Sequence, residues 1–152
     1  YVCIVPEKRK EITTEGGLNL SRNNNKIKKM ISKLNKNKIR TSLFINPNTK
    51  NILLAKKLNS DCVELHTGKL TDLIKSNKNY FNELNKIKSS SKLARSVGLE
   101  VHAGHGIDFK SIKVLNKINE IEEFNIGHFI IGQSIFDGFK MVIKKFIKLS
   151  NN

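Results

Sequence analysis

The 152-residue sequence is poor in cysteine and proline, with two residues of each, and it contains no tryptophan. Both cysteines, Cys3 and Cys62, lie in short apolar runs, so we expect reduced buried thiols rather than a disulfide framework or a metal site. No apolar run approaches the roughly 18 residues that a membrane-spanning helix needs. The first ten residues, YVCIVPEKRK, do not follow the pattern of a secretory signal, and we therefore expect a cytoplasmic protein.

Acidic residues are also scarce, with 13 against 28 lysines and arginines, which gives a net charge of +15. This charge raises the alternative of a basic nucleic-acid-binding protein, because clustered lysine and arginine side chains bind phosphate backbones. The excess is mostly lysine mixed with asparagine, as in NNNKIKKMISKLNKNK, and few aromatic residues lie among the positive charges. Such a pattern is typical of solvated helix faces, so we expect no specific nucleic-acid site.

Short apolar runs alternate with helix-compatible segments along the whole chain. We expect strands at 1–5, 41–45, 62–66, 99–103 and 128–132, and helices at about 21–37, 49–59, 72–97, 110–119 and 134–148. The apolar residues expected to share one face of the last helix are Ile135, Phe136, Phe139, Val142, Ile143 and Phe146. The alternation predicts a single α/β domain, with parallel strands joined by right-handed crossovers.

Functional side chains of such folds gather at the carboxyl ends of the strands. In the segment CVELH, strand alternation places Glu64 and His66 on the face opposite Val63 and Leu65. If Val63 and Leu65 meet the helices, Glu64 and His66 point inward. Burial of a carboxylate is costly unless it is paired or hydrogen-bonded, so an inward Glu64 suggests a functional role.

The triplet Gly104-His105-Gly106 follows the fourth expected strand. Glycines allow positive φ angles and close approach of the backbone to a ligand, and their amides can face a phosphate near a helix start. Histidine titrates near neutral pH and can move protons. Taken alone, the triplet is better explained by a turn with a solvent-facing histidine. For His66 and His102 we expect hydrogen-bonded, inward-facing side chains.

Two further features concern ligands. The four histidines show none of the compact spacings of metal ligands, and we expect no metal ion. The segment 6–17, PEKRKEITTEGG, is too long for a simple turn. Loops of this length are often binding loops or lids, although a flexible surface loop is the alternative.

Five motifs together resemble one family. VCIVPEKRKEITTEGGLNL, TSLFINP, VELHTG, VHAGHGID and FNIGHFIIGQSIFDGFK occur in the order and approximate spacing of the pyridoxine 5'-phosphate synthase family. The resemblance spans essentially the whole chain. It implies a (β/α)8 TIM barrel, of which residues 1–152 would hold roughly the last five β/α units and lack the amino-terminal strands.

The resemblance also implies an activity. The family condenses 1-deoxy-D-xylulose 5-phosphate with 3-amino-2-oxopropyl phosphate to form pyridoxine 5'-phosphate, phosphate and water in vitamin B6 biosynthesis. It implies a transferase-type ring closure without a cofactor, in a homo-oligomer. Another TIM barrel enzyme that processes phosphorylated sugars remains an alternative.

Individual residues match functional positions of the family. By this resemblance His105 corresponds to the proton donor, and Glu64 corresponds to a residue that stabilises the transition state. The residues that match substrate-binding positions are Thr13, Gly106, Gly127 and His128. Thr13 would contact the deoxyxylulose phosphate, the other three would contact 3-amino-2-oxopropyl phosphate, and segment 6–17 resembles a mobile cover over the site.

The sequence departs from the family pattern at two positions and in length. His102 stands where asparagine is common, which adds a titratable group near the expected acid, and Gln133 stands where arginine is usual. A full barrel takes roughly 250 residues, and five barrel strands cannot close a ring. We therefore expect a fragment of a longer protein that folds poorly and is inactive on its own.

Overall fold

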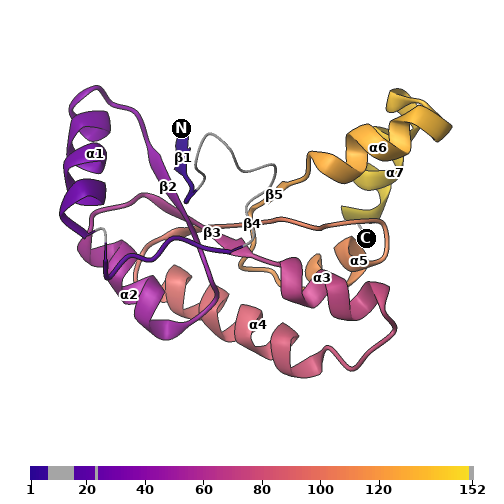
Figure 1. Cartoon of the computed structure of the whole chain (residues 1–152), viewed down its shortest axis with the longest axis horizontal. Coiled ribbons are helices and arrows are strands. Elements are labelled where there is room, and N and C mark those ends of the chain that lie inside the picture. Colours follow the sequence, from indigo (N-terminus) through magenta and orange to yellow (C-terminus); the bar gives the residue numbers. More distant parts are fainter. Residues whose placement is uncertain (7–15, 23, 151–152) are drawn as a thin grey trace.

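The structure, a computed structural model, describes residues 1–6, 16–22 and 24–150. Its strands form one parallel sheet in the order β1-β2-β3-β4-β5. The strands are β1 (Val2–Ile4), β2 (Thr41–Ile45), β3 (Cys62–His66), β4 (Glu100–Gly104) and β5 (Glu123–Asn125). The helices are α1 (Asn24–Lys36), α2 (Thr49–Lys57), α3 (Gly68–Lys75), α4 (Phe81–Ser96), α5 (Ser111–Leu115), α6 (His128–Asp137) and α7 (Phe139–Ser150). The predicted α/β class with parallel strands is confirmed (Figure 1).

The sheet is curled as in a barrel wall. Five flat strands would hold β1 and β5 about 19 Å apart, at about 4.8 Å per strand. The Tyr1 hydroxyl, next to β1, nevertheless donates a hydrogen bond to the Glu123 carboxylate of β5. The Tyr1 ring also lies 5.2 Å from the His102 ring of β4. Side chains from the two edges therefore meet across the concave face, and the fold is a half-barrel that corresponds to part of a TIM barrel.

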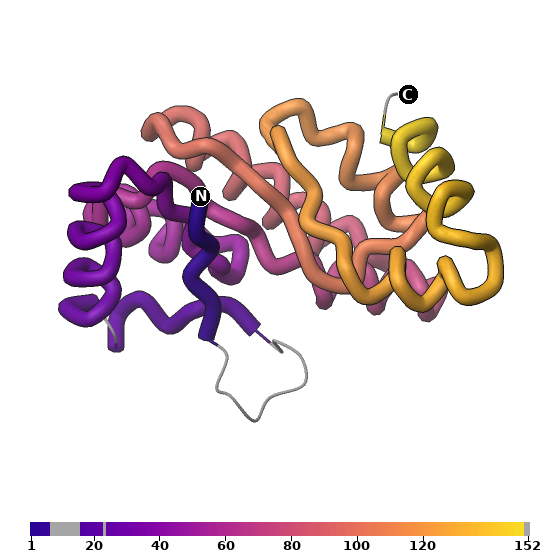
Figure 2. The backbone as a smooth tube through the Cα atoms, turned by 90° about the horizontal axis from the view of Figure 1, so that it is seen from above, coloured from indigo at the N-terminus to yellow at the C-terminus, as the bar shows by residue number. Residues whose placement is uncertain are grey.

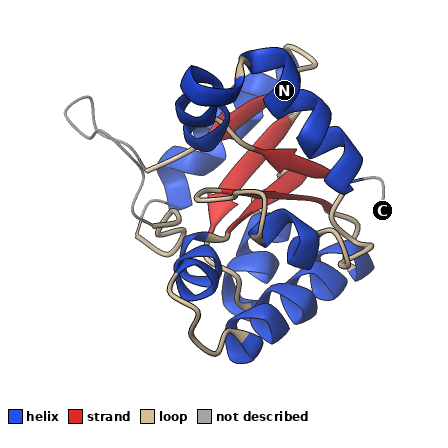
Figure 3. Ribbon diagram, turned by 90° about the vertical axis from the view of Figure 1, so that its right-hand side faces the viewer, coloured by secondary structure: helices blue, strands red, loops and turns tan. Residues whose placement is uncertain are grey.

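Helices cover the convex face of this sheet. In Figure 1, α2, α3 and α4 lie together on one side of the strands, and Figure 2 shows α1 at one end of the molecule and α6 and α7 at the other. The strands form a single layer among the helices in Figure 3. Asn48 caps α2, since its side chain accepts a hydrogen bond of 2.9 Å from the amide of Asn51. No helix of the described residues is long and apolar enough to cross a membrane.

The apolar core lies between the convex face and the helices. Val63 and Leu65 of β3 are fully buried members of this core, as predicted from the alternation in CVELH. Glu64, between them in sequence, lies on the concave face and is buried with 8% of its surface exposed. The period of two along the strand thus separates a hydrocarbon face from a polar one.

The expected strand at 128–132 is wrong. These residues lie in α6, and β5 is the shorter segment Glu123–Asn125, which pairs with β4 through the partners His102 and Glu123, Ala103 and Phe124, and Gly104 and Asn125. A short apolar run such as HFII fits a buried strand and a helix equally well. The correction moves Gly127 and His128 from the entrance of a strand to the start of a helix that follows a strand.

The helix boundaries also differ in two places. The expected helix 72–97 is split into α3 and α4, with Asn77 at a φ of 52° between them. The expected helix 134–148 is split into α6 and α7 at Gly138. Because the two helices point in different directions, the expected single apolar face does not form: Val142 is buried, whereas Phe136 is 83% exposed.

Candidate active site

A cavity of about 750 Å³ lies at the carboxyl ends of the strands. Each strand contributes to its wall a residue from within the strand or directly after it: Val5, Phe44, Glu64, His105 and Asn125. The volume lies within the range of about 300–1,000 Å³ that is typical of small-molecule sites. The side chains that were expected to gather at this end of the sheet therefore surround a cavity large enough for a small molecule.

Glu64 lies on the concave face with two hydrogen-bond donors. Its Oε2 accepts a bond of 2.9 Å from Asn125 Nδ2 and a bond of 3.3 Å from the Cys3 thiol. Burial raises the pKa of Glu64 above its ordinary value, and the two hydrogen bonds partly oppose this effect. Burial and the nearby Glu64 raise the pKa of Cys3 to about 12, so this thiol stays protonated and can donate. Glu64 is thus held in place from both β1 and β5.

Gly104 provides the space that the Glu64 carboxylate occupies. A Cβ atom at this position would overlap Glu64 Oε1, which lies directly against the glycine backbone. In the parallel register Gly104 pairs with His66, two residues beyond the pair of Glu64 and His102. The first glycine of the triplet is therefore required for close approach of a side chain rather than for a positive φ.

His105 and Gly106 form a left-handed turn at the rim of the cavity, with φ angles of 80° and 75°. This backbone conformation is uncommon for a residue with a side chain and needs support from its surroundings. The Thr67 hydroxyl lies 2.8 Å from the Gly104 carbonyl oxygen and 2.7 Å from that of His105, and the Thr67 amide also donates to Gly104. Thr67 therefore ties the loop after β3 to the turn that presents the His105 imidazole.

His66 packs between two residues that line the cavity. Its ring centroid is 4.8 Å from that of His105 and 5.3 Å from that of Phe44. Burial lowers the pKa of His66 and the nearby His105 lowers it further, so His66 is neutral near neutral pH. Its Nε2 has no hydrogen-bond partner among the described residues, which differs from the expected hydrogen-bonded histidine.

His102 matches the expectation more closely. It is fully buried, and its Nε2 lies 2.8 Å from Glu100 Oε1. Its register partner on the neighbouring strand is Glu64, and the charge of His102 lowers the pKa of that carboxyl group. The titratable group that departs from the family pattern thus acts on Glu64.

The amino end of α6 forms the opposite wall of the cavity. Gly127 is its cap residue and His128 its first residue, and both line the cavity together with Gly106. Amides in the first turn of a helix have no partner within the helix, and the helix dipole favours negative charge there. Lys75 adds a positive side chain to the lining. This wall is therefore suited to bind a phosphate group.

Gln133 contributes no such charge. It lines the cavity, and its Nε2 donates a hydrogen bond of 2.9 Å to Asp137 on the same helix.

Thr13 lies outside the described residues, as does most of segment 6–17. Of the residues on either side of this gap, Val5 lines the cavity, and the Gly17 amide donates a 3.1 Å bond to Asn46 Oδ1 just after β2.

Five of the six predicted site residues therefore line one cavity: Glu64, His105, Gly106, Gly127 and His128. Sequence reasoning did not identify Asn125, Cys3 or Thr67 as part of the site. Asn125 stands two residues before Gly127 in FNIGH, and Thr67 directly follows His66 in VELHTG, so both belong to motifs already noted. Nothing in the sequence around Cys3 indicates its contact with Glu64.

A curled parallel sheet with helices outside and a cavity at the carboxyl ends of its strands defines a protein of the (β/α)-barrel class. Comparison with family models gives a match over residues 1–152 to the family described as pyridoxal phosphate biosynthesis protein PdxJ. The chain belongs to this family.

Curated relatives agree with this assignment. A pyridoxine 5'-phosphate synthase of Pelagibacter ubique is 61% identical over 151 residues, which cover 99% of this chain and 63% of the relative. The enzymes of the same name from Zymomonas mobilis and Desulfatibacillum aliphaticivorans are 44% and 42% identical, over 95% and 97% of this chain and 56% and 60% of their own lengths. The chain thus spans less than two thirds of each of these relatives.

Proposed function

We propose that this chain forms part of a pyridoxine 5'-phosphate synthase, which condenses 1-deoxy-D-xylulose 5-phosphate with 3-amino-2-oxopropyl phosphate in vitamin B6 biosynthesis. The observation that carries this proposal is the single cavity that contains Glu64, His105 and the amino end of α6. The name shared by the curated relatives supports the same activity.

The proposed ring closure requires Schiff-base formation, loss of phosphate and loss of water. Protons must therefore be delivered to departing oxygen atoms. His105 is proposed as the donor, since its imidazole lines the cavity at a turn fixed by Thr67. A well-placed acid or base contributes about 10²–10⁴-fold to the rate.

Glu64 is proposed to stabilise the cationic intermediates that follow imine formation. Its carboxylate lines the same cavity and is held by Asn125 and Cys3, so little reorganisation is needed when positive charge develops nearby. Burial raises the pKa of Glu64, and the hydrogen bonds from Cys3 and Asn125 oppose this effect and so favour the ionised form that this role needs.

The phosphate of 3-amino-2-oxopropyl phosphate is proposed to bind between Gly106 and the amino end of α6, where Gly127 and His128 lie. Thr13 is proposed to contact the other substrate, and segment 6–17 to cover the site. A closed cover would exclude water and protect reactive imines from hydrolysis.

We also propose a cytoplasmic homo-oligomer. Both cysteines are free thiols, which is usual for proteins of reducing compartments. The homo-oligomer follows from the family resemblance, and sedimentation of the full-length protein tests it.

The test uses His105→Asn and Glu64→Gln in the full-length protein, with formation of pyridoxine 5'-phosphate followed from the two substrates. We expect kcat to fall about 10²–10⁴-fold in each variant while circular dichroism stays unchanged. Glu122→Gln is the matched control, because Glu122 is an exposed carboxylate that pairs with Arg95 away from the cavity.

Near-normal turnover in either site variant would remove that residue from the mechanism. Absence of ring closure by the unmodified protein, together with tight and sequence-selective nucleic-acid binding, would overturn the proposed function. Weak binding that disappears with added salt would reflect the net charge of +15 alone.

A further inference from the structure

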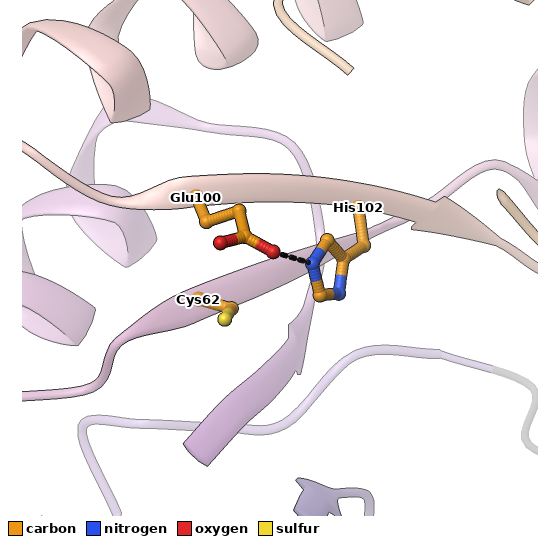
Figure 4. Close-up of side chains that lie close together, drawn as sticks. All are labelled: Cys62, Glu100 and His102. Carbon is orange, nitrogen blue, oxygen red and sulfur yellow. Dashed lines mark hydrogen bonds and ion pairs between the residues drawn. The ribbon is translucent and has the colours of Figure 1, made fainter. Parts of the chain in front are cut away.

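A second polar cluster lies on the concave face, toward the amino ends of β3 and β4. The parallel register pairs Cys62 with Glu100, and it pairs Glu64 with His102 two residues closer to the cavity. Figure 4 shows the side chains of Cys62, Glu100 and His102 directed toward one another from the two strands. Among the described residues, these three offer a sulfur, a carboxylate oxygen and an imidazole nitrogen that all lie within 4.8 Å of one another.

This cluster is costly to bury. Cys62 and His102 are fully buried, and the Glu100 side chain is 27% exposed. The interior of a (β/α) barrel is usually filled by layers of branched apolar side chains. Ionisable groups in such a position need partners or a ligand, and the proposed ring closure uses none of these three residues.

We propose that Cys62, Glu100 and His102 bind a divalent transition-metal ion of the zinc class. A thiolate, an imidazole and a carboxylate are the ligand types that zinc accepts, and three protein ligands leave a fourth position for water or another group. The proposal is independent of the proposed function. It also differs from the expectation of no metal, which considered spacings along the sequence rather than neighbours across strands.

The surroundings of His102 fit a metal ligand. Its Nε2 faces Glu100 within the cluster, whereas its buried Nδ1 has no hydrogen-bond partner among the described residues. Glu123 Oε1 lies 3.9 Å from this Nδ1. A histidine that binds a metal through one nitrogen commonly donates its other N–H to a carboxylate. A small shift of Glu123 would complete this arrangement.

Arg40 competes for the same groups. Its Nη2 lies 3.2 Å from Cys62 Sγ and pairs with the Glu100 carboxylate. The Arg40 side chain is 53% exposed, so it can turn into solvent without opening the core. Metal binding would therefore replace an exposed positive charge at the edge of the cluster by a divalent ion inside it.

Binding also requires that Cys62 Sγ and His102 Nε2 carry no hydrogen. Burial, with help from the Glu100 charge, raises the pKa of Cys62 to about 11, so the thiol is protonated at neutral pH. The hydrogen bond from His102 and the bond from Arg40 lower the pKa of Glu100, which is already ionised. The Cys62 S–H bond breaks as the sulfur–metal bond forms, and the proton goes to solvent. His102 Nε2, which faces Glu100, must likewise give up its hydrogen when it binds the ion. Affinity should therefore rise with pH.

The test titrates the full-length protein with Co²⁺ alone, a probe whose bond to thiolate gives a charge-transfer band in the near ultraviolet. We expect one equivalent of Co²⁺ to produce the band, protons to be released on binding, and Zn²⁺ to displace the Co²⁺. Cys62→Ser should abolish the band. Cys3→Ser is the matched control and should retain it, because Cys3 contacts Glu64 rather than this cluster.

Two further variants keep the test decisive if Cys62→Ser fails to fold. His102→Asn should weaken Co²⁺ binding at least about tenfold, and Arg40→Ala should tighten it about tenfold by removing the competing charge. Absence of the band at stoichiometric Co²⁺ would overturn the proposal. A band that is lost in Cys3→Ser, or unchanged affinity in both His102→Asn and Arg40→Ala, would overturn it as well.

Discussion

The two faces of the sheet differ sharply in chemistry although they come from the same strands. The convex face presents Val63, Leu65 and Val101, which are fully buried among the helices. The concave face presents Glu64 and His102, which are buried as well but polar. Burial alone therefore does not distinguish the core from the site. The distinction comes from the alternation along each strand, since a slip of one residue would exchange the two sets.

The side chains of the two faces are stabilised in different ways. The convex face is stabilised by removal of hydrocarbon from water, with nearly every side chain replaceable by another of similar volume. The concave face depends on specific partners, such as the bonds from Asn125 and Cys3 to Glu64. Substitutions on the first face should change stability, and substitutions on the second should change activity.

The largest effect is expected on the convex face. Leu43→Ala removes a fully buried side chain of β2 and should lower the free energy of unfolding of the full-length protein by about 2–5 kcal/mol. Urea denaturation measures this loss, and kcat of the folded protein should stay within about twofold. Leu53→Ala in α2 is the control, because Leu53 is 50% exposed and should change stability by about 0.5 kcal/mol or less. Equal losses in the two variants would contradict the assignment of the core.

The next effect tests the concave face through Gly104. In Gly104→Ala the added methyl group would displace the Glu64 carboxylate, and kcat should fall about 10²-fold. Steady-state kinetics of the single and double variants measure the coupling. In a Glu64→Gln background, Gly104→Ala should lower kcat much less, because the carboxylate that the methyl group displaces is already absent. Equal losses in both backgrounds would show that Gly104 acts independently of Glu64.

A smaller effect is expected for the positioning residue Thr67. Thr67→Val keeps the shape but removes the hydroxyl that contacts the Gly104 and His105 carbonyl groups, at a cost of about 1 kcal/mol in stability. If the turn then loosens, kcat should fall about tenfold with little change in KM. Thr67→Ser should restore most of the activity, whereas an unchanged kcat in the valine variant would show that the turn holds without this contact.

The smallest effect is a change in pH dependence. Burial raises the pKa of Glu64 and the Asn125 bond lowers it, so Asn125→Ala should raise this pKa further. The acidic limb of the kcat/KM profile should then move to higher pH. A raised pKa in the folded state favours the protonated form, so the loss of stability should be smaller at mildly acidic than at mildly alkaline pH. Asn119→Ala, at an exposed position, should leave the limb in place.

Much of this contrast between faces could be predicted from the sequence. Alternation in CVELH was sufficient to place Glu64 opposite Val63 and Leu65, because strand geometry has a fixed period. The position of His105 at the carboxyl end of β4 followed from the rule for parallel sheets. Both inferences depend only on residues that are close together in the chain.

The remainder depends on residues that are distant in the chain. Cys3 and Asn125 each lie 61 residues from Glu64, and their contacts depend on the curvature of the whole sheet. The run at 128–132 was misassigned because an apolar stretch of this length fits either secondary structure. The cluster of Cys62, Glu100 and His102 required the register between β3 and β4, which no single segment specifies.

The contacts of Arg40 have a consequence for how the acidity of Glu64 could be tuned. Arg40 at the solvent edge bonds Glu100, Glu100 bonds His102, and the charge of His102 acts on Glu64. This relay runs the length of the concave surface, from the end remote from substrate to the proposed reaction centre. A substitution at an outlying arginine could therefore adjust proton affinity at the reaction centre while every substrate contact stays intact.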